Sequence, residues 1–173
     1  QNLDIAATRK NYVDYLAHRP RVEKIGEHGL FTDEGEPVVL GQVQNQVADH
    51  KGIVWTHVIS LRREDAARLG YDSAVQWMAL LRSKRAMLCK HMKIDSANLK
   101  WYAAFHNESH HPHVHLLVYS VKDGEGYLTK QSIEAMRSEL AHDIFRQDFA
   151  NIYEEQAQSR MDLKERSEVV MKT

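Results

Sequence analysis

The chain has 173 residues, of which 43% are hydrophobic and 27% are charged, ordinary values for a folded domain. These values exclude a collagen-like rod and a disordered tail, and no stretch approaches the roughly 20 consecutive apolar residues that a membrane-spanning helix needs. The single cysteine, Cys89, excludes a disulfide framework and a cysteine-based zinc module, and it fits a reducing cytoplasm.

Hydrophobic spacing and turn residues predict helices and strands in mixed order along the chain. The predicted helices cover residues 6–18, 39–49, 62–69 and 73–92 and a segment that begins at Thr129, and the predicted strands cover residues 53–61, 99–106 and 113–121. A long polar loop at 18–37 separates the first two helices. This order, without strict βαβ alternation, predicts an α+β fold: an antiparallel central sheet with helices packed mainly on one face.

The length predicts a single domain over residues 1–173, which we expect to be part of a longer protein. Its last helix is expected to bury one apolar stripe, formed by Ile133, Met136, Leu140, Ile144, Phe145 and Ile152. Residues 154–173 are charged and are expected to continue as a helix or to fray.

Eleven histidines are unusual for this length, and four of them lie between His110 and His115. Side chains alternate along a strand, so His113 and His115 share one face. If residues 107–112 connect the last two strands, His106 lies opposite His113 in an antiparallel ladder, where paired Cβ atoms are about 4.5–5.5 Å apart. Three imidazoles on one patch form a metal platform with open coordination positions, which a catalytic site requires. We therefore predict these three histidines as metal ligands.

Other polar residues are candidates for supporting roles around this patch. Glu108 lies in the connection between the strands and is expected to orient a ligand histidine or to reach the metal. His111 is a candidate for supporting one of the metal-binding histidines, or for contacting a phosphate. His57, on the strand at 53–61, is a third-strand candidate for the same patch, in a supporting role and not as a ligand.

Three blocks of the sequence carry a family likeness: residues 11–21 (NYVDYLAHRPR), residues 56–63 (THVISLRR) and residues 106–115 (HNESHHPHVH). They resemble the tyrosine motif, the central strand and the H-x-D/E-x-x-H-P-H-x-H metal motif of relaxases. The chain thus resembles the HUH endonuclease superfamily, and most closely the MobL-like branch of the MobP relaxases. Of the three blocks, the histidine motif is the one that is specific for this family, and the other two are weak evidence on their own.

This resemblance implies a nickase built on a variant of the ferredoxin-like topology. Such enzymes cut one DNA strand at an origin of transfer: a tyrosine attacks the scissile phosphate, forms a 5′-phosphotyrosyl bond and leaves a free 3′-OH. Tyr15 occupies the tyrosine position of the motif, and Tyr12, three residues earlier on the same helix, is the alternative nucleophile. Glu108 occupies the acidic position. The family usually has a strand before this helix, and residues 1–5 are too short to supply it.

The resemblance also implies partners and a cofactor. Mg²⁺ or Mn²⁺ is expected, whereas imidazole ligands alone favour Zn²⁺ or another transition metal. The expected partners are single-stranded origin-of-transfer DNA, accessory relaxosome proteins and a type IV coupling protein. The expected location is the bacterial cytoplasm, with transfer to the recipient cell alongside the DNA.

Basic and aromatic residues supply candidate DNA contacts. We expect phosphate contacts from Arg19, Arg21, Lys24, Arg62 and Arg63. Trp55, Tyr102 and Tyr119 are candidates for stacking on unpaired bases.

Three other functions use parts of the same pattern. A rolling-circle replication initiator or an HUH transposase has the same cluster and the same chemistry. A histidine-ligated metallohydrolase that does not act on DNA would need no tyrosine. A binding-only protein would hold a DNA end without forming a covalent adduct.

Overall fold

A three-stranded antiparallel sheet lies at the centre of residues 1–133 in the computed structural model of the chain. The structure describes the backbone of residues 2–172 and the side chains of residues 5–161. Strand β3 (His113–Ser120) lies between β1 (Trp55–Ser60) and β2 (Leu99–His106) and pairs antiparallel with both. The predicted α+β class and the three predicted strands are confirmed.

One face of the sheet is covered by the first two helices, α1 (Asn2–His18) and α2 (Leu40–Asp49). They pack on the side of β2 and β3 that carries Tyr102, Ala104 and Leu117, all of them buried. The apolar residues of α1 and α2 recur at helical spacing, so that one side of each helix enters this core.

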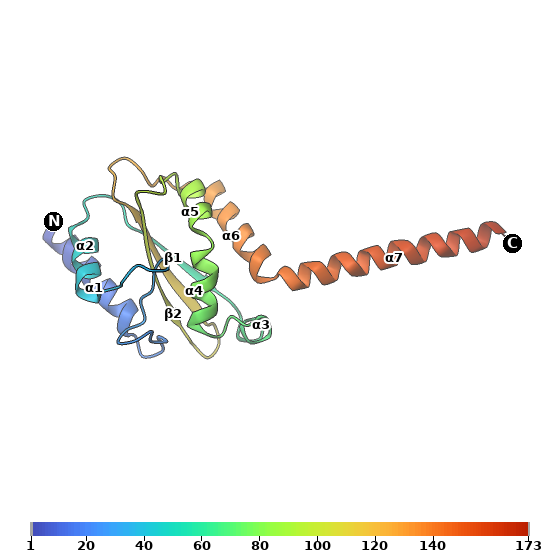
Figure 1. Ribbon diagram of the computed structural model, residues 1–173, viewed down its shortest axis with the longest axis horizontal. Helices are drawn as coiled ribbons and strands as arrows, with labels where there is room; N and C mark the ends of the chain where they lie inside the picture. Colours follow the sequence, from blue (N-terminus) through green and yellow to red (C-terminus); the bar gives the residue numbers. More distant parts are fainter. Residues whose placement is uncertain (1, 173) are drawn as a thin grey trace. The chain divides into compact units, whose positions relative to one another are not determined.

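Helices also cover the opposite face, whereas we expected them mainly on one side. Helix α4 (Ala74–Arg82) packs there, where the rings of Trp77 and Phe105 stack with centroids 6.3 Å apart, and α5 (Arg85–Met92) follows it. Figure 1 shows the sheet between α1 and α2 on one side and α4 and α5 on the other. The reason lies in β2 and β3, which are apolar on both faces, so that each face needs a cover.

The segment at 18–39 runs along the free edge of β2 and is not an unattached polar loop. Backbone bridges join Val22 to His106 and Phe31 to Ala103, the latter with N–H···O distances of 2.8 and 2.9 Å. Leu30 and Phe31 are buried. This segment therefore satisfies backbone groups that an edge strand would leave unpaired.

The helix predicted at 73–92 is interrupted at Ser83 and Lys84 and forms α4 and α5. The Ser83 hydroxyl donates a hydrogen bond of 2.5 Å to the Leu80 carbonyl, which competes with the regular backbone ladder. Hydrophobic spacing alone does not reveal this break, because the apolar stripe continues through it.

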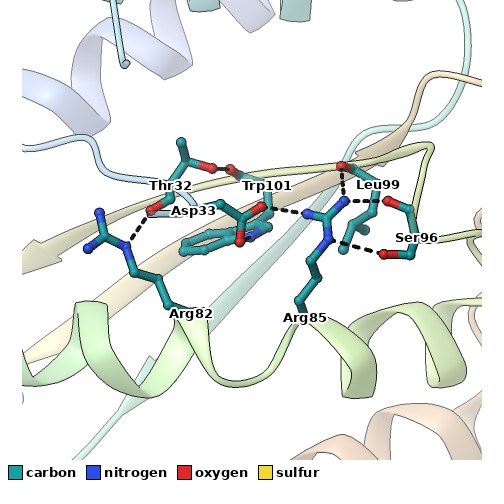
Figure 2. Close-up of polar contacts among 7 residues, drawn as sticks. All are labelled: Thr32, Asp33, Arg82, Arg85, Ser96, Leu99 and Trp101. Carbon is teal, nitrogen blue, oxygen red and sulfur yellow. Dashed lines mark hydrogen bonds and ion pairs between the residues drawn. The ribbon is translucent and has the colours of Figure 1, made fainter. Parts of the chain in front are cut away.

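A polar network around Arg85 ties the edge segment to α5 and to the sheet (Figure 2). Arg85 donates to Asp33 at 2.5 Å, and the other carboxylate oxygen of Asp33 accepts a bond of 3.0 Å from the Trp101 indole N–H. Arg85 also donates to the carbonyls of Ser96 and Leu99. Trp101 is only 1% exposed, so its N–H depends on Asp33 for a partner.

Helix α3 (Arg63–Leu69) follows β1 and ends as predicted at Gly70. The backbone of Gly70 adopts the left-handed conformation (φ 84°), which favours glycine after a helix.

Residues 134–172 belong to a second compact unit. Helix α6 (Lys130–Ile144) ends before Phe145, and α7 (Arg146–Lys172) follows, so residues 154–172 continue as a helix. The predicted single stripe is wrong in part: Met136, Leu140 and Ile144 are buried, whereas Ile133 and Ile152 are 37% and 47% exposed. Within the described part of the chain, no helix combines the length and apolar character needed to cross a bilayer.

Replacement of Asp33 by alanine is expected to lower the free energy of unfolding by about 2 kcal/mol, because it leaves the buried Trp101 N–H unpaired and removes a charged partner of Arg85. Urea denaturation followed by tryptophan fluorescence measures the change. The matched control is Glu34→Ala, a neighbouring exposed residue, with an expected change within about 0.5 kcal/mol. Equal effects of the two variants would contradict this role of Asp33.

Candidate metal centre and tyrosine site

Three histidine side chains meet on the α1-covered face of the sheet, where β2 ends and β3 begins. His106 pairs with His113 and Ala104 with His115, which is the predicted register. Ring centroids are 5.3 Å apart for His106 and His113, 4.6 Å for His106 and His115, and 5.0 Å for His113 and His115. One ring nitrogen of each lies within 4.8 Å of the others. This three-histidine cluster has the donor set of a metal centre with open coordination positions.

Backbone carbonyls engage the second ring nitrogen of two of these histidines. Nε2 of His106 lies 3.1 Å from the carbonyl oxygen of Leu16, near the end of α1. Nδ1 of His113 lies 2.9 Å from the carbonyl oxygen of His111. A carbonyl only accepts, so both contacts require a ring N–H there and leave the lone pair on the other nitrogen. Metal-binding histidines are oriented by this kind of contact.

The third histidine is contacted by a tyrosine of α1. The Tyr12 hydroxyl lies 3.4 Å from Nδ1 of His115, and it also forms a hydrogen bond with Thr56 on β1. Burial, together with the nearby Tyr15, raises the pKa of Tyr12 despite the bond with Thr56. Tyr12 is therefore a neutral phenol that orients His115.

The remaining nitrogens of the cluster fit a bound cation. Nδ1 of His106 and Nε2 of His115 are buried and have no hydrogen-bond partner. Burial lowers the pKa of His106, and burial together with the neighbouring histidines and Arg19 lowers the pKa of His115 to about 4. Both rings are thus neutral at pH 7, which metal ligation requires. Buried polar atoms are normally paired, and a metal ion would satisfy both.

Tyr15 lies beside the cluster with its side chain open to solvent. Its ring centroid is 6.4 Å from that of His106 and 6.5 Å from that of His115, and the residue is 45% exposed. Its ring stacks with that of Tyr12 at 6.5 Å. The two tyrosines, three residues apart on α1, therefore lie on the same side of the helix but differ in burial.

Arg19 links Tyr15 to Glu108. Its guanidinium donates a hydrogen bond to the Tyr15 hydroxyl oxygen and lies 5.3 Å from the centre of that ring. Its other terminal nitrogen lies 3.4 Å from the Glu108 carboxylate. Glu108 is not part of the three-histidine cluster, and its carboxylate contacts Arg19 instead.

Of the two predicted supporting histidines, only His57 lies away from the cluster. His57 pairs with Leu116, whose side chain lies on the face opposite His115, so the prediction that His57 joins the cluster is wrong. The face on which His57 lies depends on how β1 is paired with β3, and the spacing of residues in the sequence does not give that pairing. His111 contacts His113 through its backbone carbonyl, and its own side chain is exposed.

The predicted DNA-binding arginines and lysine fall into three groups. Arg21 and Lys24 are exposed, and Arg62 is exposed with a surface ion pair to Asp65 at 3.2 Å. Arg19 contacts Tyr15 and Glu108, as above. Arg63 differs from both groups because its guanidinium is held by the connection between β2 and β3.

Two of the three predicted base-stacking residues are buried, and the third, Trp55, is partly buried. Tyr102 and Tyr119 are 8% and 4% exposed in the core beneath α1 and α2, so they present no ring to a base. The indole N–H of Trp55 donates a 2.7 Å bond to the Gly126 carbonyl. Aromatic residues at alternating strand positions serve the core here, which is their usual role.

Sequence reasoning missed the Leu16 carbonyl, and it gave Arg19 and Arg63 only the role of phosphate contacts. The Leu16 carbonyl carries no side-chain signal. Arg19 lies four residues after Tyr15, and this i, i+4 spacing on or just beyond a helix indicates that the two side chains meet. Arg63 begins α3, and its contact with the connection between β2 and β3 depends on tertiary structure.

Comparison with known families identifies the chain at the level of the family. A family model described as MobL relaxases matches residues 7–172. No curated protein and no solved structure matches the chain. The matched range includes both tyrosines of α1 and all three histidines of the cluster. The chain therefore belongs to the MobL relaxase family.

Proposed function

We propose that this relaxase nicks one DNA strand at an origin of transfer by attack of Tyr15 on the scissile phosphate, next to a divalent cation held by the three-histidine cluster. The observation that carries the proposal is the exposed Tyr15 ring, 6.4 and 6.5 Å from two rings of the cluster. Membership of the MobL family favours this reaction over a replication initiator, a transposase or a hydrolase that does not act on DNA.

The ligands of the cation would be Nδ1 of His106 and Nε2 of His113 and His115. The carbonyls of Leu16 and His111 require a ring N–H on the second nitrogens of His106 and His113, and Nδ1 of His115 would donate to the Tyr12 oxygen, which leaves Nε2 free for the cation. When bound, the cation supplies Lewis-acid polarisation of the phosphate and orients it. We expect Mg²⁺ or Mn²⁺, as the family resemblance implies, with Zn²⁺ or another transition metal able to occupy the same imidazoles.

The reaction transfers a phosphoryl group with balanced atoms. A bond forms between the Tyr15 hydroxyl oxygen and phosphorus, the bond from phosphorus to the 3′ oxygen breaks, and the proton released by Tyr15 ends on that 3′ oxygen. Arg19 donates to the Tyr15 oxygen and therefore stabilises negative charge as the phosphate approaches. In the reverse reaction the same oxygen leaves, so Arg19 assists rejoining as well.

Several contacts support Tyr15 over Tyr12 as the nucleophile. Tyr12 is half-buried, and its hydroxyl is engaged by His115 and Thr56. Burial also raises its pKa, which opposes formation of a phenolate. Tyr15 is 45% exposed, and its hydroxyl lies beside a guanidinium. A strand of DNA would reach Tyr15 first.

The DNA strand would be guided by exposed basic residues around the site. Arg21 lies next to the cluster, because its carbonyl accepts a 2.8 Å bond from the N–H of Asn107, and Lys24 follows in the same segment. Together with Arg62 they would neutralise phosphates, which makes affinity depend on salt. The further partners we propose are accessory relaxosome proteins and a type IV coupling protein, in a bacterial cytoplasm.

Replacement of His113 by alanine is expected to weaken Mn²⁺ binding by about 100-fold or more, because loss of a ligand costs at least as much as loss of its supporting contacts. Isothermal titration calorimetry of the metal-stripped chain measures the dissociation constant. His57→Ala is the matched control, since His57 lies on the other face of the sheet, and its affinity should stay within about twofold. Unchanged binding by His113→Ala would exclude this metal site.

Replacement of Tyr15 by phenylalanine is expected to abolish the covalent protein–DNA adduct, because the attacking oxygen is removed. The test incubates the chain and Mn²⁺ with a labelled single-stranded oligonucleotide carrying the origin of transfer of its own element, followed by denaturing electrophoresis. Tyr12→Phe should retain the adduct at a rate lowered about tenfold, since it keeps the attacking oxygen and loses the hydroxyl contacts with His115 and Thr56. An adduct that persists in Tyr15→Phe and disappears in Tyr12→Phe would assign the attack to Tyr12.

Replacement of Arg19 by alanine is expected to slow adduct formation by about 100-fold, the usual cost of removing one preorganised donor at a reacting oxygen. Single-turnover rates from quenched time courses give this number. Mn²⁺ affinity should remain within a few-fold, because Arg19 contacts Tyr15 and Glu108 and no ring nitrogen. Arg21→Ala, an exposed neighbour, controls for general phosphate attraction; if it slows the reaction equally, the specific role of Arg19 fails.

A further inference from the structure

The connection between β2 and β3 joins two strands that both carry metal-ligand candidates, and one side chain from another element holds it. That side chain is Arg63, the first residue of α3. Its terminal nitrogen donates to the Asn107 side-chain oxygen at 2.7 Å and to the Glu108 carbonyl, and its Nε donates to the Ser109 carbonyl at 3.1 Å. The backbone N–H of Arg63 adds a 3.1 Å bond to the His110 carbonyl.

These bonds cover four consecutive residues of the connection. The next residue is His111, whose carbonyl lies 2.9 Å from Nδ1 of His113. The connection is also attached at its far end, where Leu61 N–H donates to the Pro112 carbonyl at 3.1 Å. The His111 carbonyl thus lies between two anchored points, and its direction sets the ring orientation and the tautomer of His113.

The chemistry of an arginine suits this task. A guanidinium presents five donors in a rigid fork, so one side chain can bind several oxygens at fixed angles. The groups that Arg63 binds are an amide oxygen and two backbone carbonyls, none of which carries a formal charge. These acceptors engage Nε and one terminal nitrogen of Arg63, whereas the neighbouring Arg62 is exposed.

We infer that Arg63 is a positioning residue for the metal centre: it fixes the connection at 107–110, and through the His111 carbonyl it orients His113 toward the cation. This assigns Arg63 to the metal centre and not to DNA phosphate contact, the role that sequence reasoning gave it. The inference rests on the proposed metal site, and it makes a statement about metal affinity that is independent of DNA cleavage.

The test compares two adjacent arginines in the metal-stripped full chain. Mn²⁺ titration calorimetry should give a dissociation constant raised about tenfold for Arg63→Ala, the usual lower range for loss of a contact that supports a ligand. Arg62→Ala should stay within about twofold, because the exposed Arg62 side chain pairs with Asp65 on its own side of the chain and not with the connection at 107–110. Arg63→Lys should recover little, since an ammonium cannot bind the amide and both carbonyls together.

A spectroscopic readout separates orientation of the ligand from general stability. The visible absorption of bound Co²⁺ depends on the geometry of its ligands, so Arg63→Ala at saturating Co²⁺ should show altered bands while Arg62→Ala keeps the wild-type spectrum. Thermal unfolding in EDTA monitors folding of each variant. If Arg63→Ala does not fold, Asn107→Ala, which removes one acceptor of Arg63, should still raise the Mn²⁺ dissociation constant about threefold.

Two outcomes would overturn the inference, and they are distinguishable. Wild-type affinity and spectrum in a folded Arg63→Ala or in Asn107→Ala would overturn the positioning role alone. Failure of the wild-type chain to bind either metal would overturn the proposed metal site, and the positioning role with it.

Discussion

The antiparallel register of β2 against β3 is the constraint on which the site depends. Pairing of His106 with His113 brings two ligand candidates together across the ladder, and the alternation of side chains adds His115 from the next position on the same face. A slip of one residue would carry His106 to the other face and dissolve the cluster. The register is secured by buried apolar residues on both faces of these strands, so the stability of the core and the geometry of the site have one origin.

Helix α1 completes the site because it crosses the same face on which the histidines lie. Its buried side, with Val13, Leu16 and Ala17, packs on the sheet and brings the Leu16 carbonyl to His106. The helical period then sets how deeply each of the two tyrosines is buried. Tyr12 lies nearer the core and supports a ring of the cluster, and Tyr15, almost one turn later, remains accessible at its rim. One helix thus supplies a supporting carbonyl, an orienting phenol and an exposed phenol.

Strand alternation and the spacing of histidines were sufficient to predict β2, β3 and the cluster, because both patterns are local and have a period of two. The same reasoning failed for His57, since the pairing parity of β1 with β3 depends on a connection of more than fifty residues. It also failed for the helix at 73–92, where the apolar stripe continues across the break at Ser83 and Lys84. Errors therefore occur where a tertiary contact or a polar side chain overrides a periodic pattern.

Three arginines that looked alike in the sequence differ in what surrounds their guanidinium groups. Arg62 is exposed and paired only at the surface, where an ion pair contributes little and a phosphate can displace it. Arg19 contacts a phenol and a carboxylate beside the cluster, so its charge is available to an incoming phosphate. Arg63 donates to an amide and to carbonyls of the connection between β2 and β3. Its donors therefore hold that connection in place. Charge alone predicts one role for all three arginines. The groups that each guanidinium contacts are the basis on which we propose three different roles: attraction of DNA, assistance to Tyr15 and orientation of a ligand histidine.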